Sequence, residues 1–214
     1  APSVSNLEIT PTGPKTADSL TANYDYSDPD SDAESGSEIC WYKNGVLQPA
    51  LNDTLIVGSG NTSKGENWYF TIKPKDGTDF GTVKQSAVTT IVNSPPTASN
   101  LQISPSSPKT ADSLVASYDF NDPDGDIESG TEIIWYKNGV LQGSLNGSTT
   151  VASTYTAKGD EWHFKVKPSD GTDAGNWTSC PVNVTIGNTA PSVSNLEITP
   201  TGPKTADSLT ANYD

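Results

Sequence analysis

The sequence repeats itself at two distances, and this repetition limits the fold more than any other feature. With a shift of 94 residues, segment 41–48 (WYKNGVLQ) recurs unchanged as segment 135–142. With a shift of 189 residues, the first 25 residues recur without a difference at the end of the chain. Chains with such internal copies are built from similar units in series, and we expect the natural protein to continue. The predicted domains are a first copy at 1–94, a second copy at 95–189 and the start of a third, truncated copy at 190–214.

Apolar residues alternate with polar ones in each copy, which is the period of a strand with one buried face. In the first copy the positions expected to face inward are Leu7, Ile9, Leu20, Ala22, Tyr24, Tyr26, Ile39, Trp41, Trp68, Phe70, Ile72, Val88 and Ile91. In the second copy they are Leu114, Ala116, Tyr118, Phe120, Ile133, Trp135, Trp162, Phe164, Val166, Val182 and Ile186.

Between these runs stand hairpin dipeptides, which tolerate the backbone angles of tight turns. They are Asn44-Gly45, Asp76-Gly77, Asn138-Gly139 and Asp170-Gly171. About seven short strands in each copy, without helical periodicity, predict an all-β fold class. We expect tandem immunoglobulin-like antiparallel β-sandwiches, joined by short Pro-containing linkers such as the one with Pro95 and Pro96.

The charge of the chain excludes one class of partner and favours another. There are 26 acidic residues against 12 basic ones, all 12 of them lysine, and the formal net charge is −14. A chain without arginine and with this negative field is a poor ligand for nucleic acid and for anionic membrane surfaces. The same field suits divalent cations, or a solvated surface without an ion. No segment approaches the ~20 consecutive apolar residues of a membrane span, so we expect no membrane insertion.

Four motifs of the second copy, in this order, carry a resemblance to a known family. They are segments 122–130 (DPDGDIESG), 133–139 (IIWYKNG), 159–162 (GDEW) and 168–171 (PSDG). The series resembles the tandem Ig-like, cadherin-like (PKD-like) repeats of bacterial and archaeal cell-surface proteins, and the resemblance covers both copies. It implies an extracellular protein of the cell surface: a stalk, adhesin, surface layer or fibre. The chain departs from antibody-type domains because it lacks their internal cysteine pair.

An acidic loop follows the second expected strand of each copy. Its carboxylates stand at every other position: Asp28, Asp30, Asp32 and Glu34 in the first copy, and Asp122, Asp124, Asp126 and Glu128 in the second. Carboxylates are costly to crowd unless a cation neutralises them. Calcium, a hard ion that takes six to eight oxygen ligands in flexible geometry, is the expected cofactor. The alternative is a solvated polar loop without an ion.

In a sandwich of this type the acidic loop lies at the end where the domain begins. We expect it beside the loop with Asp76 and Asp79 in the first copy, and beside Asp170 and Asp173 in the second. The cadherin-like resemblance suggests that calcium at the second loop stiffens the linker at residues 93–96.

The two cysteines, Cys40 and Cys180, stand in different copies, and neither has a cysteine at the equivalent position of the other copy. Cys40 alternates with two apolar neighbours, so its side chain is expected on the outer face of its sheet. A bond needs Cα atoms within about 7 Å, which domains in an extended series would not provide. We favour a disulfide between neighbouring chains, or between successive turns of an assembly, with free thiols as the alternative.

Five sequons would accept glycans on an exported chain, although Ser/Thr-rich sequences also produce this tripeptide by chance. Their asparagines are Asn52, Asn61, Asn146, Asn176 and Asn183.

The chain lacks the residues of a catalytic site. His163 is the only histidine, and Tyr69 stands at its equivalent position in the first copy. Without a second histidine, a Gly-x-Ser-x-Gly elbow or a cysteine beside a base, nucleophilic catalysis has no candidate residues. The paired carboxylates could imitate a glycosidase, but an exposed turn offers no pocket that raises the pKa of one of them. We predict that the chain is not an enzyme.

The preferred function is structural: a repeat unit of a cell-surface stalk, fibre or filament that self-associates through neighbouring repeats or chains. The alternative is a carbohydrate- or cell-binding adhesin module, or an accessory module of a secreted hydrolase. Trp177, where the first copy has Val83, is a candidate surface aromatic that could bind a glycan or equally pack against a neighbour.

Overall fold

The computed structural model describes all residues, 1–214. By their contacts the residues form two compact units. The first unit comprises 1–101, 118–133 and 165–179, and the second comprises 102–117, 134–164 and 180–214. The first unit therefore contains the whole first copy and part of the second. The domain boundaries expected at residues 94 and 189 stay a prediction.

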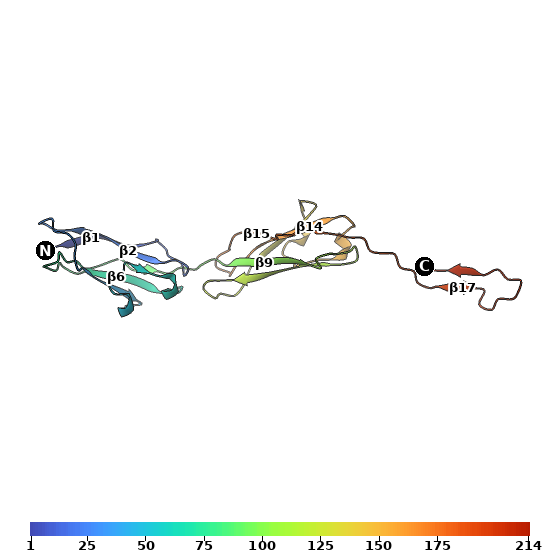
Figure 1. The fold of residues 1–214 in the computed structure, drawn as a ribbon, viewed down its shortest axis with the longest axis horizontal. Coiled ribbons are helices and arrows are strands. Elements are labelled where there is room, and N and C mark those ends of the chain that lie inside the picture. The colour runs from blue at the N-terminus through green and yellow to red at the C-terminus, as the bar shows by residue number, and fades with distance from the viewer. The chain divides into compact units, whose positions relative to one another are not determined.

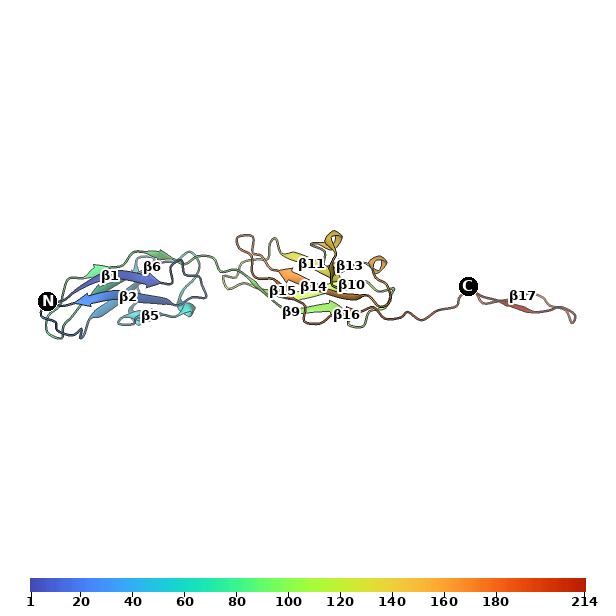
Figure 2. The same cartoon turned by 90° about the horizontal axis from the view of Figure 1, so that it is seen from above.

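The first copy consists of two antiparallel sheets. One has the strand order β1-β2-β5, and the other has β4-β3-β6-β7, with β8 paired to the opposite end of β6 from β7 (Figures 1 and 2). The strands are β1 (Ser3–Thr10), β2 (Leu20–Ser27), β3 (Glu38–Lys43), β4 (Val46–Leu47), β5 (Ile56–Val57), β6 (Asn67–Lys73), β7 (Lys84–Gln85) and β8 (Thr89–Thr90). Two short 3-10 helices lie in the connections, η1 (Pro49–Leu51) and η2 (Ser59–Asn61).

The second copy has the same strand order in both of its sheets, β13-β10-β9 and β12-β11-β14-β15, with β16 paired to β14. The strands are β9 (Thr97–Ser104), β10 (Leu114–Asn121), β11 (Glu132–Lys137), β12 (Val140–Leu141), β13 (Thr150–Val151), β14 (Glu161–Lys167), β15 (Thr178–Ser179) and β16 (Val184–Thr185). The 3-10 helices η3 (Gly143–Leu145) and η4 (Ser153–Tyr155) take the places of η1 and η2. The prediction of all-β, tandem immunoglobulin-like sandwiches is confirmed.

The core of each copy is built around two tryptophans and one phenylalanine. In the first copy Trp41, Trp68 and Phe70 are fully buried, and the two indole rings meet edge to face with centroids 6.3 Å apart. In the second copy the rings of Trp135 and Trp162 meet in the same way at 6.2 Å. These residues occupy alternate positions of β3, β6, β11 and β14, so the strand period itself directs them into the core.

The alternation fails as a guide in the last strand of each copy. Val88 and Val182, expected to face inward, are 56% and 62% exposed. The strand is broken here into two short pieces, β7 and β8 or β15 and β16, and the break changes which residues point inward. Ser86 in the first copy and Cys180 in the second are buried in place of the valines.

The hairpin between β3 and β4 confirms the turn expected at Asn44-Gly45. Both residues have positive φ, 50° and 79°, and Lys43 pairs directly with Val46 across the two-residue turn. Asn138 and Gly139 repeat this geometry in the second copy, with φ of 50° and 77°. Asparagine and glycine adopt this backbone region at little cost, which fixes the register of the hairpin.

Three of the four core indoles have a hydrogen-bond partner. Trp41 donates to the carbonyl of Thr54 at 2.9 Å, and Trp68 donates to the carboxylate of Glu66 at 3.0 Å. Trp135 bonds a backbone carbonyl as Trp41 does. The Nε1 of Trp162 is buried without a partner. Asp160 stands where the first copy has Glu66, and its side chain is one methylene shorter.

We expect Asp160→Glu to raise the stability of the second copy by about 1 kcal/mol, the typical net value of one hydrogen bond, because the longer carboxylate reaches Trp162 Nε1. Thermal unfolding followed by tryptophan fluorescence would measure the change. The matched variant, Glu66→Asp, should lower stability in the first copy by removing the equivalent bond. A lower Tm for Asp160→Glu would contradict this explanation.

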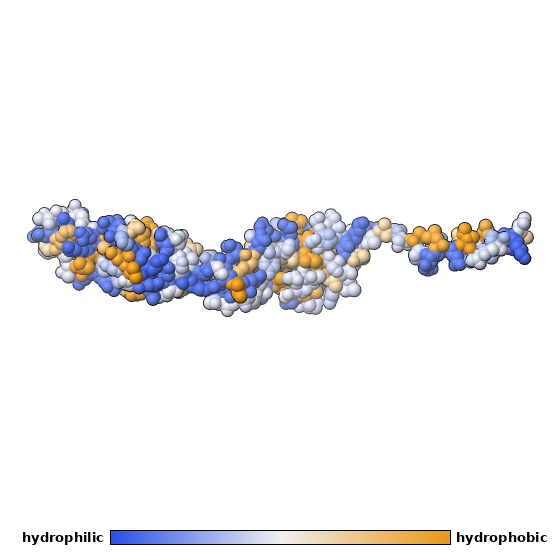
Figure 3. Space-filling view, turned by 90° about the horizontal axis from the view of Figure 1, so that it is seen from below, coloured by the Kyte–Doolittle hydropathy of each residue, from blue (hydrophilic) through white to orange (hydrophobic).

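The third copy of the sequence reproduces the local structure of the first 25 residues. Strands β17 (Glu197–Thr199) and β18 (Thr210–Asn212) pair antiparallel in the register of β1 and β2. Ile198 is nevertheless 59% exposed, whereas Ile9, at the identical position of the first copy, is 6% exposed. Apolar side chains accordingly lie on the surface of this hairpin (Figure 3). Burial of Ile9 therefore depends on the residues after 27 that complete the first sandwich.

Candidate metal centre

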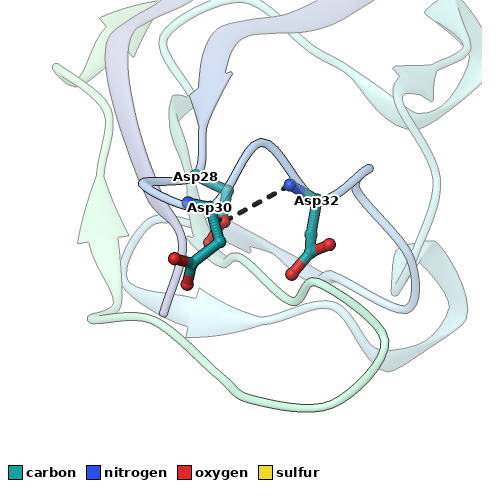
Figure 4. Close-up of side chains that lie close together, drawn as sticks. All are labelled: Asp28, Asp30 and Asp32. Carbon is teal, nitrogen blue, oxygen red and sulfur yellow. Dashed lines mark hydrogen bonds between the residues drawn. The ribbon is translucent and has the colours of Figure 1, made fainter.

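Three aspartates of the first acidic loop lie together directly after β2. Oδ1 of Asp28 accepts hydrogen bonds from the backbone N–H groups of Asp30, at 2.8 Å, and Asp32, at 3.4 Å. These bonds fold the loop back over the Asp28 side chain, so that the three carboxylates approach one another (Figure 4). One oxygen of each lies within 4.8 Å of the others. We call this group the Asp28 cluster.

The second oxygen of Asp28 has no hydrogen-bond partner, although its side chain is only 1% exposed. The hydroxyl of Tyr26 is also buried without a partner. Burial raises the pKa of Tyr26, and the negative charges of Asp28, Asp76, Glu34 and Asp32 raise it further. Two unsatisfied oxygens are therefore associated with this acidic loop.

The loop with Asp76 lies beside the acidic loop, as expected, because Ser35 forms a parallel bridge with Asp76. Oδ1 of Asp76 accepts the backbone N–H groups of Asp79 at 2.6 Å and Thr78 at 2.8 Å. These two bonds lower the pKa of Asp76. Near this loop, Gly81 approaches the N-terminal segment so closely that a Cβ would lie 2.0 Å from the carbonyl oxygen of Pro2.

Glu34 and Glu128, the fourth expected ligand in each loop, are not part of the clusters. Glu34 accepts a hydrogen bond from the hydroxyl of Tyr24 at 3.0 Å, and Glu128 accepts one from Tyr118 at 2.7 Å. Burial, together with these acidic partners, raises the pKa of both tyrosines to about 12. The glutamates thus anchor the ends of the acidic loops to the adjacent strands.

Asp122, Asp124 and Asp126 form the Asp122 cluster, which has the same loop geometry. Asp122 Oδ1 accepts the N–H groups of Asp124 at 2.8 Å and Asp126 at 3.1 Å, and its Oδ2 is buried without a partner. One neighbour differs from the first copy: Phe120 stands where Tyr26 carries its hydroxyl.

The outer aspartates of the second cluster have partners from the first copy, all within the first compact unit. Asp124 accepts the backbone N–H of Ser94 at 2.6 Å and the hydroxyl of Thr16. Asp126 forms an ion pair with Lys64, whose Nζ also contacts Asn93 Oδ1 at 3.0 Å.

The amide of Asn93 continues this network by donating to Asp170 and Asp173, at 2.9 Å each. The hydrogen bond to Asp126 is the main cause that raises the pKa of Lys64. For Asp170, burial acts to raise the pKa, but hydrogen bonds from Asn93 and from the N–H groups of Asp173 and Thr172 outweigh it and lower the pKa. The linker residues Asn93 and Ser94 are therefore bonded into the acidic loops.

The cysteines lie in different surroundings. Cys40 is half-buried, between the inward-facing Ile39 and Trp41, and forms no disulfide. Cys180 is 7% exposed, and its thiol lies 3.3 Å from the carbonyl of Val182. An inter-chain disulfide at Cys180 would require this strand to open, while Cys40 is more accessible. The cross-link stays a prediction.

The remaining candidates lie on the surface. All five sequon asparagines, Asn52, Asn61, Asn146, Asn176 and Asn183, are exposed, and glycosylation stays a prediction. Trp177 is 43% exposed, as expected for a surface aromatic. The ring of His163 stacks on Tyr136 with centroids 4.7 Å apart, just as Tyr69 stacks on Tyr42 in the first copy.

We expect the stability of the chain to fall on acidification. A carboxyl whose pKa is lowered by folding stabilises the protein above its unfolded pKa, and the contribution is lost as the pH falls through the folded value. For Asp76 and Asp170 the ordinary value is 3.8. Urea unfolding should give a free energy that is constant above about pH 5 and decreases below about pH 4. Asp76→Asn should show a smaller decrease. Stability that rises between pH 5 and pH 3 would contradict this account.

No family model matches the sequence, and no curated protein matches it. Among solved structures, the chain is similar to the fibronectin(III)-like modules of Clostridium thermocellum CbhA, at 14% identity over 86% of this chain and 95% of that one, with a TM-score of 0.33. It is also similar to a segment of two fibronectin type-III domains from chicken tenascin, at 10% identity over 85% of this chain and 98% of that one, with a TM-score of 0.35. It is also similar to the chicken interferon gamma receptor alpha chain, at 11% identity over 86% of this chain and 98% of that one, with a TM-score of 0.47. These similarities carry no information on function. The helices of the chain are three-residue 3-10 turns, and none of them could span a membrane.

Proposed function

We propose that the chain is a repeat unit of an extracellular cell-surface stalk, fibre or filament, in which each sandwich serves as a non-catalytic spacer. The main support for this function is the comparison of the two copies, which share some features and differ in others. They retain the buried tryptophan pair, the strand order and the acidic loop. They change half-buried groups: Tyr69 becomes His163, and Cys40 becomes Ile134. This pattern fits a structural function, which depends on the sandwich fold and on the loops at its ends, better than a catalytic function, which would depend on a reaction site on the surface.

The surroundings of the titratable groups also support a structural function. The His163 ring stacks face to face on Tyr136, and Tyr69 stacks on Tyr42 in the same way in the first copy, so this position accepts a histidine or a tyrosine. The acidic clusters lie in loops, and their inner oxygens bond to backbone N–H groups. Self-association would use exposed apolar residues that recur at the β3-β4 and β11-β12 hairpins, where Val46 and Val140 are each 64% exposed.

Single-molecule force extension of the chain tests the spacer function. We expect two separate unfolding events, because each copy has its own buried core. Each event should lengthen the chain by about 300 Å, since roughly 94 residues extend to about 3.6 Å each before the folded length is subtracted. The matched variant Trp41→Ala should lower the unfolding force of the first copy alone, because the cavity costs about 3–5 kcal/mol in that core. A chain that extends without a force peak would exclude a load-bearing function.

One observation favours the alternative of glycan binding. A hollow of about 560 Å³ lies over the β1-β2-β5 sheet, and its lining combines amide, carboxylate and aromatic groups. It includes Asn6, Asn23, Asp25, Tyr24 and Glu34. Such groups can hydrogen-bond and stack with a sugar ring. A glycan array would decide: a hit that is lost in Tyr24→Ala would support the adhesin function, and no hit would favour the spacer.

A further inference from the structure

We propose that the Asp28 cluster and the Asp122 cluster each bind one divalent cation of the calcium class, and that Lys64 occupies the second site until the cation displaces it. The proposal concerns the acidic loops and does not depend on the spacer function, since the sandwiches are held by their cores with or without an ion.

Oδ2 of Asp28 and Oδ2 of Asp122 are buried and accept no hydrogen bond. A buried carboxylate oxygen without a partner is rare in proteins, because it has lost its water and gained nothing in return. The same defect occurs at the same position in both copies, which argues against an accident of packing. No lysine forms an ion pair with Asp28 or with Asp122. A bound cation would satisfy both oxygens.

The chemistry of the groups indicates which cation fits. The ligand atoms of each cluster are carboxylate oxygens within 4.8 Å of one another, without nitrogen or sulfur. Hard cations prefer such a set, and calcium tolerates the irregular geometry and the added waters that a three-aspartate loop requires. Magnesium demands a near-octahedral arrangement and loses its water reluctantly.

Lys64 makes the two sites unequal. Its ammonium pairs with Asp126 and contacts Asn93, so it already neutralises part of the Asp122 cluster. Asp32, the equivalent of Asp126, has no lysine partner. A divalent cation and the Lys64 ammonium cannot both lie against the Asp126 carboxylate without repulsion. Cation binding at the Asp122 cluster must therefore release Lys64 and also compete with the hydrogen bonds that the two oxygens of Asp124 accept from Thr16 and Ser94. The Asp28 cluster should accordingly bind the ion more tightly.

Calorimetric titration of the full 214-residue chain with calcium chloride is the first test. We expect two sites, of which the Asp28 cluster is the tighter. Asp28→Asn and Asp122→Asn should each remove one site and leave the other. The control, Glu8→Gln, removes one exposed negative charge from β1 and should leave both sites unchanged. No binding heat and no change in Tm up to about 10 mM calcium would overturn the proposal.

Thermal unfolding separates a lost ligand from a damaged fold. With a chelator, Asp28→Asn should not lower the Tm, because it removes a buried charge that has no partner while keeping the oxygen that accepts the N–H groups of Asp30 and Asp32. With saturating calcium, the same variant should unfold about 5 °C or more below the parent chain. An equal loss of Tm in both conditions would show that the carboxylate is only structural.

Lys64→Ala tests the exchange. We expect calcium affinity at the Asp122 cluster to rise about 10-fold, with the Asp28 cluster unchanged, because the competing ammonium is gone. An unchanged affinity would overturn the part assigned to Lys64. Magnesium chloride in place of calcium should bind at least about 10-fold more weakly at both sites, and equal binding would overturn the assignment to the calcium class.

Discussion

Each of the two complete sandwiches depends on the burial of an edge-to-face tryptophan pair between two small sheets. Trp41 and Trp68 project from β3 and β6, which lie next to each other in one sheet, and the second copy builds the same pair from Trp135 and Trp162. Removing a buried tryptophan costs about 3–5 kcal/mol, a large part of the stability of a domain of this size. The rest of each sandwich is arranged around this pair.

The acidic loops follow from the same core. Ala22 is buried in β2, and β2 ends at Ser27, so Asp28 is the first residue of the loop. Asp28 then receives the two backbone N–H groups that close the loop and retains an oxygen without a partner. The loop is thus a direct continuation of a core strand and not an independent appendage. This explains why it recurs in the second copy with the same hydrogen bonds.

Much of this arrangement could be predicted from the sequence, because a strand repeats every two residues. Trp41, Phe70 and Ile91 are buried as their alternation indicates. The prediction was wrong at Val88 and Val182, where the strand breaks and a period of two no longer applies. In the acidic loops, three of the four expected ligands lie together in each copy. The fourth, a glutamate, instead accepts a hydrogen bond from a tyrosine hydroxyl of the adjacent strand. Spacing alone could not reveal that a neighbouring strand offers a hydroxyl.

Residues distant in the sequence could not be predicted in this way. Lys64 is 62 residues from Asp126, and nothing local marks it as a partner. Tyr26 fits the alternation of a core residue, so its unpartnered hydroxyl is visible only once burial is known. Asn93 and Ser94 belonged to the expected linker, but their bonds to Asp170 and Asp124 depend on the folded loops.

Native-state hydrogen exchange tests most directly the claim that each copy is a sandwich held by its own tryptophan core. The amides of β3 and β6 and those of β11 and β14 should be the slowest to exchange, as two separate protected sets, because they surround the buried indoles. Rapid exchange in β18 should accompany this protection, since that strand repeats the sequence of β2 without a covered face. Protection confined to one copy, or equal protection in β18, would contradict the account.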